Sequence, residues 1–386
     1  MAGIFYGWIG VYYGELAQMI DTWAYHVESL SEYKLLLTHP LEFFTSIFSS
    51  SYEHGYTNFL STHNSWWNDV KANFLIKIMA VFNVLSFGHY YVNVIFICFA
   101  TMFGPIALYR VTADYFRKNK LAILLACFVI PSFLYWTSGL HKEGLIFTAL
   151  SFIIYSTYFT LKDGRITILR VLAVILGIGL ILILRNFLIL PLLPVYFAWL
   201  LSAKTQWRPS AVYGVVIVSS LIVFFAAKYI NPSLDFPQAT VTKQQEFMKL
   251  GGRSAVAVTT LKPEPKSFLQ NFPQSVTLSM IRPYPSDVQH LLSLAAAVEI
   301  GVLLLFTLLF LFCHKPFFRF SAFSLFLLCF AVGVMLTIGY TVNVLGAIVR
   351  YRSIVLPFLI VPMAARIDWP RVQAFLTTNM AIKNNL

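Results

Sequence analysis

Four basic residues lie beside long apolar segments, where charged side chains are uncommon. Arg185 interrupts the apolar sequence LILRNFLIL, and Arg350 and Arg352 open another apolar run in IVRYRSIVL. Lys142 separates two further runs in LHKEG, directly before Glu143. A guanidinium presents a planar set of donors that fits phosphate oxygens and stays charged. Headgroup contact would explain any one of these residues, and a solvated charge pair would explain Lys142 with Glu143. The four cations together favour an anionic ligand.

One carboxylate has the position expected of a general base. Asp21 lies in MIDTWAYH, just after a short apolar stretch, and His26 closes the same motif. In a helix Tyr25 would share a face with Asp21. A carboxylate just above a membrane can take a proton from an acceptor hydroxyl. Capping of a helix by Asp21 is the alternative, and on spacing alone it is the more common one.

A second carboxylate lies inside an apolar segment. Glu299 occurs within LLSLAAAVEIGVLLLF, where a carboxylate is costly unless it is paired or protonated. Arg282 lies in the polar segment before this run and is its predicted partner. Such a pair would either hold a loop against the helices or orient a cation that binds ligand.

The composition places these residues in a membrane protein. Of 386 residues, 58% are hydrophobic and only 11% are charged, whereas a soluble domain has about 25% charged residues. The net charge of +12 comes from Lys and Arg dispersed among apolar runs, which favours contact with lipid headgroups over nucleic acid. The first residues lack the features of a cleaved signal peptide. The cysteines lie in apolar runs without metal-ligand or disulfide spacing; they are Cys98, Cys127, Cys313 and Cys329.

The apolar segments predict an all-α polytopic protein with about ten transmembrane helices in a single integral membrane domain, residues 1–386. A first outer loop, residues 14–89, contains a short amphipathic stretch that predicts an interfacial helix. A second outer loop covers residues 230–290. The segment Ala2–Tyr13 is short for a span. The nine longer segments are Tyr90–Val111, Leu121–Leu140, Leu145–Leu161, Ile166–Leu184, Phe187–Ser202, Ala211–Tyr229, Leu291–Cys313, Phe318–Tyr340 and Gly346–Ile367.

The basic residues between these segments predict an orientation. They concentrate on alternate connections, as the positive-inside rule requires of one consistent topology. The connections counted as cytoplasmic contain Arg110, Arg117, Lys118, Lys120, Lys162, Arg165, Lys204, Arg208, Lys315, Arg319, Arg366, Arg371 and Lys383. Both long polar segments and the four basic residues beside the apolar runs therefore face outward.

The order of these features resembles the polyprenol-dependent C-type glycosyltransferases, which share the GT-C fold. It is similar, more closely, to a group of uncharacterised bacterial membrane proteins related to that fold. The short first apolar segment and the single acidic residue at the start differ from many members. The matching motifs are Asp21 before an aromatic residue, the hairpin Pro131–Glu143, the pair Gly251-Gly252, Arg282-Pro283 with Glu299, and Arg350-Tyr351-Arg352.

The resemblance implies transfer of a sugar from a polyprenyl-phosphate carrier to an acceptor glycan, lipid or protein. Asp21 would be the catalytic base, assisted by Tyr25 and His26, and the four cations would bind the phosphate. Glu143, Arg282 and Glu299 would orient those cations. The expected location is the bacterial inner membrane, with the active face extracytoplasmic.

Other functions remain open at this point. A glycan polymerase or ligase needs the same basic outer face, and a non-catalytic membrane subunit would only bind a lipid-linked glycan or a partner membrane protein. A transporter is less favoured, because no internal repeat is evident. No cofactor beyond the lipid-linked donor is expected. His54, His63 and Asp69 lack the spacing of metal ligands, so no metal site is predicted, although a divalent ion at the donor stays open.

Overall fold

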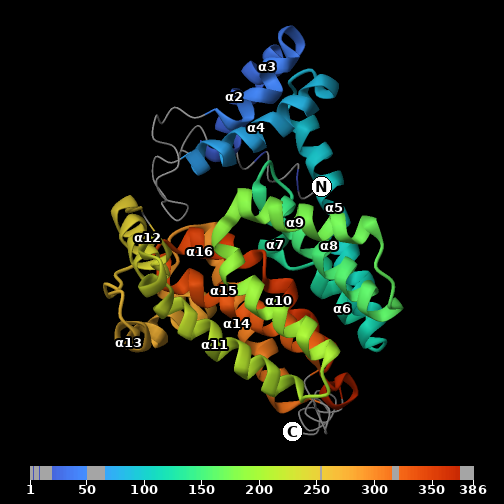
Figure 1. The fold of residues 1–386 in the computed structure, drawn as a ribbon, viewed down its shortest axis with the longest axis vertical. Helices are drawn as coiled ribbons and strands as arrows, with labels where there is room; N and C mark the ends of the chain where they lie inside the picture. The colour runs from blue at the N-terminus through green and yellow to red at the C-terminus, as the bar shows by residue number, and fades with distance from the viewer. Residues whose placement is uncertain are drawn as a thin grey trace, which may run out of the picture. The chain divides into compact units, whose positions relative to one another are not determined.

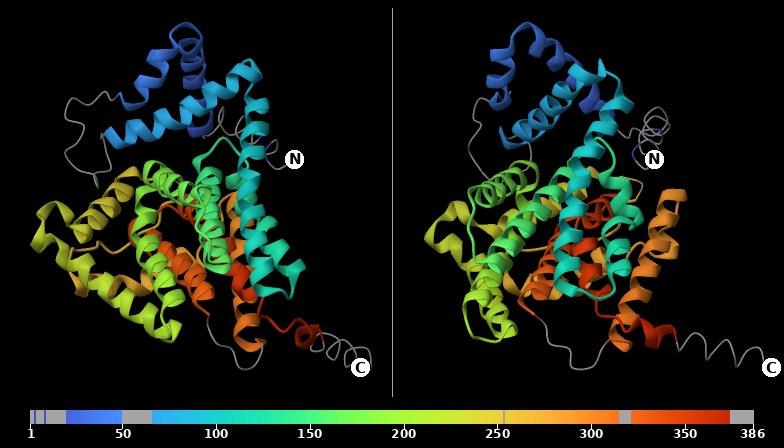
Figure 2. Two further views of the ribbon diagram at one scale, coloured as in Figure 1. Left: turned by 45° about the vertical axis from the view of Figure 1, so that its right-hand side comes forward. Right: turned by 90° about the vertical axis from the view of Figure 1, so that its right-hand side faces the viewer.

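The fold is known from a computed structural model, which describes residues 3, 8, 20–49, 66–252, 254–314 and 321–373, without the side chains of residues 20, 21 and 66–68. Every regular element in these ranges is a helix (Figures 1 and 2). Contacts between Cα atoms divide the chain into two compact units. Unit 1 comprises Met1–Val111, Pro131–Leu190 and Phe224–Lys243, and unit 2 comprises Thr112–Ile130, Pro191–Val223 and Gln244–Leu386.

Six helical stretches are long and apolar enough to cross a membrane, and two bent helix pairs raise the number to eight. The described part of the chain therefore fits a polytopic membrane protein, while the predicted count of ten and the GT-C arrangement stay predictions. The six stretches are Tyr90–Phe116, Lys142–Asp163, Ile168–Lys204, Pro209–Ile230, Leu291–Phe312 and Ala322–Thr341, and the bent pairs are Lys120–Phe128 with Pro131–Thr137 and Leu345–Ser353 with Leu356–Ala364.

Unit 1 contains an antiparallel hairpin of two such helices, α8 (Lys142–Asp163) and α9 (Ile168–Arg185). Gly164 closes α8 in the left-handed region, with φ 64°, where a side chain would be strained. Gly177 lets the two helices approach closely, since an added Cβ would lie 2.7 Å from Cγ1 of Ile153. The hairpin therefore brings the start of α8 to the same end as the end of α9.

The stretch Ile168–Lys204 is interrupted at Arg185, whose backbone leaves the helical region with φ −154° and ψ 73°. A short 3₁₀ turn, η2 (Asn186–Leu188), follows before α10 (Ile189–Lys204) begins. At 37 residues this stretch exceeds the roughly twenty residues that cross a bilayer core. The break thus falls where the sequence predicts the boundary between two spans.

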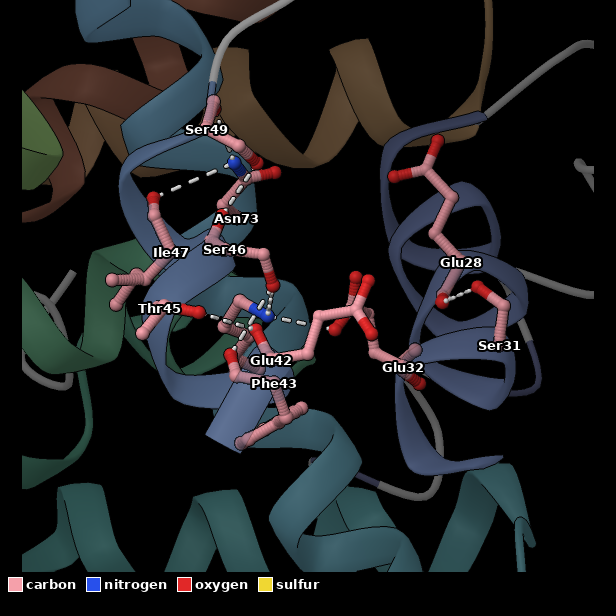
Figure 3. Close-up of polar contacts among 12 residues, drawn as sticks. Glu28, Ser31, Glu32, Glu42, Phe43, Thr45, Ser46, Ile47, Ser49 and Asn73 are labelled. Atoms are coloured by element: carbon pink, nitrogen blue, oxygen red, sulfur yellow. Dashed lines mark hydrogen bonds and ion pairs between the residues drawn. The ribbon is translucent and has the colours of Figure 1, made fainter. Parts of the chain in front are cut away.

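The segment predicted to form the first outer loop contains helices α2 (Ile20–Thr38), α3 (Pro40–Thr45), η1 (Ser46–Phe48) and α4 (Trp66–Ser86). Nζ of Lys77 on α4 donates to Glu32 at 2.7 Å and to Oγ of Ser46 at 2.9 Å (Figure 3). The same ammonium lies 4.3 Å from the ring centre of Phe43, and Asn73 donates to the carbonyl of Ser49 at 3.1 Å. One buried cation therefore joins α2, α3 and η1 to α4. Helix α4 does not meet the criteria for a membrane span.

Helix α4 leads into α5 (Tyr90–Phe116), which starts the first candidate span. Asn93 donates to Oδ1 of Asn83 at 2.6 Å, and Asn83 donates to Oγ of Ser29 at 2.9 Å. All three side chains are fully buried. This polar chain fixes the α2–α4 segment to the first turn of the span.

Unit 2 is built around α15 (Ala322–Thr341), whose phenylalanines form much of the core. Phe326 packs on Phe330 with ring centres 6.2 Å apart, and Phe330 packs on Phe358 of α17 (Leu356–Ala364) at 5.8 Å. Gly339 allows α13 (Pro265–Val276) to pass closely, since a Cβ there would lie 2.1 Å from the carbonyl oxygen of Ser275. Bulky substitution at Gly339 would separate these helices.

The remaining helices of unit 2 include part of the segment predicted to form the second outer loop and the candidate span α14. A π-helical turn, η4 (Thr277–Ile281), continues α13, and η5 (Pro285–Asp287) precedes α14 (Leu291–Phe312). Helix α14 leaves one apolar face exposed, formed by Leu294, Val298, Val302 and Leu305, as expected of a lipid-facing helix. The other helices assigned wholly or mainly to unit 2 are α6 (Lys120–Phe128), α10, α11 (Pro209–Ile230) and α16 (Leu345–Ser353), whereas α12 (Phe236–Leu250) is divided between the two units at Lys243.

Candidate functional site

A buried ion pair lies at one end of the α8–α9 hairpin. The guanidinium of Arg185 donates to the carboxylate of Glu143, and both side chains are buried. Glu143 lies in the first turn of α8 and Arg185 is the last residue of α9. Each charge therefore lies at the end of its own helix that favours it, the anion at an N-terminus and the cation at a C-terminus.

Two more side chains extend this pair toward α2. Nδ1 of His141 lies 3.9 Å from Oε2 of Glu143, and its Nε2 lies 3.3 Å from Oγ1 of Thr22. Both His141 and Thr22 are buried. The arrangement forms a line of polar groups from Arg185 through Glu143 and His141 to Thr22, which can transmit a change of charge along its length.

Lys71 is a further cation within electrostatic range of Arg185. Helix α4 packs against α9, and this packing brings Lys71 within electrostatic range of Arg185 and Lys243. Burial, followed by the charges of Lys243 and Arg185, lowers the pKa of Lys71 from 10.5 to about 8. A lysine with this pKa responds to any anion that enters its surroundings, because a negative charge favours its protonated form.

An aromatic cluster holds α2 against the start of α5. The rings of Trp23 and Tyr90 stack at 4.1 Å, and His26 meets the edge of Tyr90 at 5.3 Å. Burial lowers the pKa of His26, so its imidazole is neutral at pH 7. This cluster accounts for His26 as a packing residue. Tyr25 lies one residue away and is half-buried.

The predicted base and the first predicted lysine lie near this region along the chain. Helix α2 includes Asp21, so the expected helical relation of Asp21 to Tyr25 is present in the backbone. The side chain of Asp21 lies outside the described residues. Lys142 is the first residue of α8 and is half-buried, directly before Glu143.

The other predicted residues meet in unit 2. Arg352 lies on α16 with its side chain fully buried, and its Nη1 donates to the carbonyl of Arg282 at 2.5 Å. The charge of Glu299 on α14 favours the charged guanidinium of Arg352. Glu299 itself is buried, on the side of α14 away from the exposed apolar face. Arg350 lies in the last turn of the same helix as Arg352.

One predicted pairing is corrected. Nε of Arg282 lies 3.6 Å from Oδ2 of Asp287, so Arg282 forms its ion pair with Asp287 and not with Glu299. The reason is local, because the short turn η5 places Asp287 next to Tyr284, whose backbone N–H donates to the same carboxylate at 2.8 Å. The ring of Tyr284 also lies under the guanidinium, 5.1 Å from its centre.

Two functional candidates were not expected from the sequence: Lys71 and Lys243. His141 lies beside Lys142 and Glu143 in the segment LHKEG, whose polar residues the sequence predicts to line a site. Lys71 and Lys243 become relevant only through the packing of distant helices, which no local pattern reveals. Among the described residues no group of His, Cys, Asp and Glu could hold a metal ion, and His54 and His63 lie outside them.

Comparison of the chain with family models, curated proteins and solved structures finds no match. The chemistry of these two clusters therefore rests on their own residues.

Proposed function

We propose that this chain is a membrane transferase that binds a polyprenyl-phosphate-linked sugar and moves the sugar to an acceptor at the extracytoplasmic face. The observation that carries the proposal is the set of cations at the end of the α8–α9 hairpin. The charges of Lys243 and Arg185 both disfavour the protonated form of Lys71, so a bound anion would relieve the repulsion that Lys71 experiences. A cluster of mutually repelling cations beside an apolar span suits the phosphate of a lipid carrier.

The proposed roles rest on the positions of the described side chains and, for Asp21, on the sequence alone. Arg185 contacts the phosphate, and Glu143 holds its guanidinium in place, since a buried charge needs a partner. Lys142 at the start of α8 adds a further cation within unit 1, while the phosphate-binding roles of Arg350 and Arg352 in unit 2 stay predictions. Asp21 is the base that takes a proton from the acceptor hydroxyl, with Tyr25 beside it on α2. Stabilisation of the leaving phosphate is the electrostatic effect that such a site supplies.

The first test is the binding of carrier by the full chain in detergent or nanodiscs. Polyprenyl monophosphate, the released carrier, is titrated against the purified wild type and Arg185→Gln. Loss of a charged hydrogen bond should weaken binding by about tenfold to a hundredfold. Arg170→Gln serves as the matched control, because Arg170 is a partly exposed arginine paired with Asp163 at 2.6 Å, and it should bind as the wild type does. Equal binding by all three proteins contradicts the proposal.

The second test separates a transferase from a subunit that only binds. Membranes containing wild type or Asp21→Asn are supplied with a panel of radiolabelled polyprenyl-phosphate sugars, and label transferred to acceptor is counted. Asp21→Asn retains size but loses the basic oxygen, so it should bind carrier normally and transfer nothing. If the wild type binds carrier and no sugar in the panel is transferred, the chain functions as a binding subunit.

A further inference from the structure

The carboxylate of Glu143 lies between a permanent cation and a titratable ring. Its Oε1 accepts a hydrogen bond from Nη2 of Arg185, and its Oε2 lies 3.9 Å from Nδ1 of His141. The second distance exceeds a hydrogen bond, but it is within ion-pair range once the imidazole carries a proton. All three side chains are buried and belong to unit 1. One buried negative charge therefore serves two groups, of which one changes its charge near neutral pH.

The second ring nitrogen of His141 has a partner that suits both protonation states. Nε2 lies 3.3 Å from Oγ1 of Thr22 on α2. A hydroxyl can donate to a neutral ring nitrogen, or accept from a protonated one after its hydrogen has rotated. The ring of Trp136 packs against the imidazole, with centres 5.7 Å apart. His141 can thus gain or lose a proton in place, without any movement of α2.

The ionisable groups around His141 come from four helices. They are Lys142 and Glu143 on α8, Arg185 on α9, Asp21 on α2, whose side chain lies outside the described residues, and Tyr135 on α7 (Pro131–Thr137). The positive charges of Lys142 and Arg185 oppose a proton on His141, whereas the charge of Glu143 favours it.

The backbone around His141 also opposes a cation. His141 is the N-cap residue of α8, and the partial positive charge of a helix N-terminus disfavours an imidazolium. The carboxylate of Glu143 is therefore the group that makes protonation of His141 favourable. Its strength as a partner of His141 depends on how much of its charge Arg185 already neutralises.

We propose that His141 is a proton-dependent partner of Glu143, and that its protonation loosens the bond between Glu143 and Arg185 and makes Arg185 available to an anion. A carboxylate that neutralises an imidazolium attracts a guanidinium less, and the new positive charge repels Arg185 directly. Phosphate binding should then strengthen as the pH falls through the titration of His141. The role of phosphate rests on the proposed function, whereas the competition for Glu143 does not.

The competition is tested in the full chain without ligand, by NMR of labelled histidine in detergent micelles. Glu143→Gln removes the charge and keeps the shape, so the titration midpoint of His141 should fall by about one pH unit or more. Arg185→Gln removes the competing cation and should raise the midpoint. His39, exposed at the start of α3, is the control and should titrate alike in all three proteins. A midpoint of His141 that neither variant moves overturns the inference.

A second measurement leaves the buried pair intact, in case the first variants fail to fold. The NMR signal of the Arg185 guanidinium is followed against pH in the wild type and in His141→Gln. It should change with pH in the wild type and lose that change in the variant, because glutamine does not titrate. The guanidinium of Arg170, which is paired with Asp163, should behave alike in both proteins. An Arg185 signal with the same pH dependence in both proteins contradicts the competition.

Binding of polyprenyl monophosphate separates this inference from the proposed function. Wild type and His141→Gln are titrated in nanodiscs of neutral lipid at acidic and at alkaline pH. Ionisation of the carrier affects both proteins equally, so the wild type should gain about threefold or more in affinity toward acid relative to the variant. Carrier binding with parallel pH profiles sustains the proposed function and overturns the release of Arg185. Competition seen by NMR in a chain that binds no carrier sustains the pairing of His141 with Glu143 and overturns the proposed function.

Discussion

Arg185 donates a hydrogen bond to Glu143, although the two residues are 42 positions apart. Glu143 lies in the first turn of α8 and Arg185 is the last residue of α9. This partner comes from the next helix, whereas Lys142 is the cation adjacent to Glu143 in sequence. The hairpin explains the contact, because α8 and α9 run antiparallel and their charged ends coincide. The pair is therefore a property of the two spans together, and its strength depends on how tightly they pack.

We expect the Glu143–Arg185 pair to matter for stability as well as binding. Removing one partner leaves the other charge buried, so Glu143→Gln or Arg185→Gln should each lower the free energy of unfolding by about 3–5 kcal/mol. The double variant Glu143→Leu with Arg185→Met should cost less than the sum of the single changes. Unfolding by denaturant in mixed micelles measures the effect. Strict additivity would show that the two side chains do not interact.

Lys77 should stabilise the helices of the first outer segment. Lys77→Met keeps the length of the side chain and its packing on Phe43, but loses the bonds to Glu32 and Ser46. Because Glu32 is partly exposed and can be hydrated, we expect a loss of about 1–2 kcal/mol. Amide hydrogen exchange should become faster in α3 and η1 while α8 is unaffected. Lys34→Met, at an exposed lysine of α2, is the control and should change neither.

The sequence predicts the class of the fold well, for physical reasons. Apolar runs of about twenty residues have few structures open to them in a bilayer, and the predicted span Leu291–Cys313 agrees closely with α14, Leu291–Phe312. The bends between α6 and α7 (Pro131–Thr137) and between α16 and α17 were not predicted, because hydropathy records the composition of a segment and not its straightness.

The site was predicted less completely. Arg185 and Arg352 could be selected because a charge in an apolar run needs an explanation, and both are buried. Glu143 and Arg282 were expected to orient the cations, but which cation each of them meets is decided by helix packing, which no local pattern reveals. The pairing of Arg282 with Glu299 was wrong because Asp287, a closer neighbour in sequence, takes that role. The prediction for Asp21 as base awaits experiment.

The orientation predicted from the basic connections can be checked by labelling. With the four native cysteines replaced, Lys249→Cys in α12 and Lys118→Cys after α5 are compared in intact cells, since both positions are exposed. A membrane-impermeant maleimide should label position 249 at once and position 118 only after the membrane is permeabilised. Asn119 is less suitable, because its side chain donates to the carbonyl of Ala365 at 3.1 Å. The opposite pattern would place both proposed sites on the cytoplasmic side.

The amine of Lys71 should titrate near pH 8, far below an ordinary lysine at 10.5. Burial and the charges of Lys243 and Arg185 disfavour its protonated form in the folded chain, whereas the unfolded chain keeps the proton until about pH 10.4. The free energy of unfolding should therefore rise with pH between these values, because the unfolded state binds more protons there.

Amine-specific labelling followed by mass spectrometry measures the titration of Lys71 directly, since only the neutral amine reacts. The midpoint of the labelling rate should lie near pH 8 for Lys71, below that of an ordinary lysine. The midpoint is independent of how accessible the amine is, because burial scales the rate at every pH alike.

Of the two neighbouring cations, Lys243 has the larger effect on Lys71. Lys243→Gln should therefore move the midpoint of Lys71 upward, whereas Lys34→Gln should leave it unchanged. Bound polyprenyl phosphate should raise it as well, because an anion among these cations favours the ammonium. A midpoint above pH 10 in the unliganded protein would mean that Lys71 is not enclosed with Lys243 and Arg185, and the cation cluster of unit 1 would lose its third member.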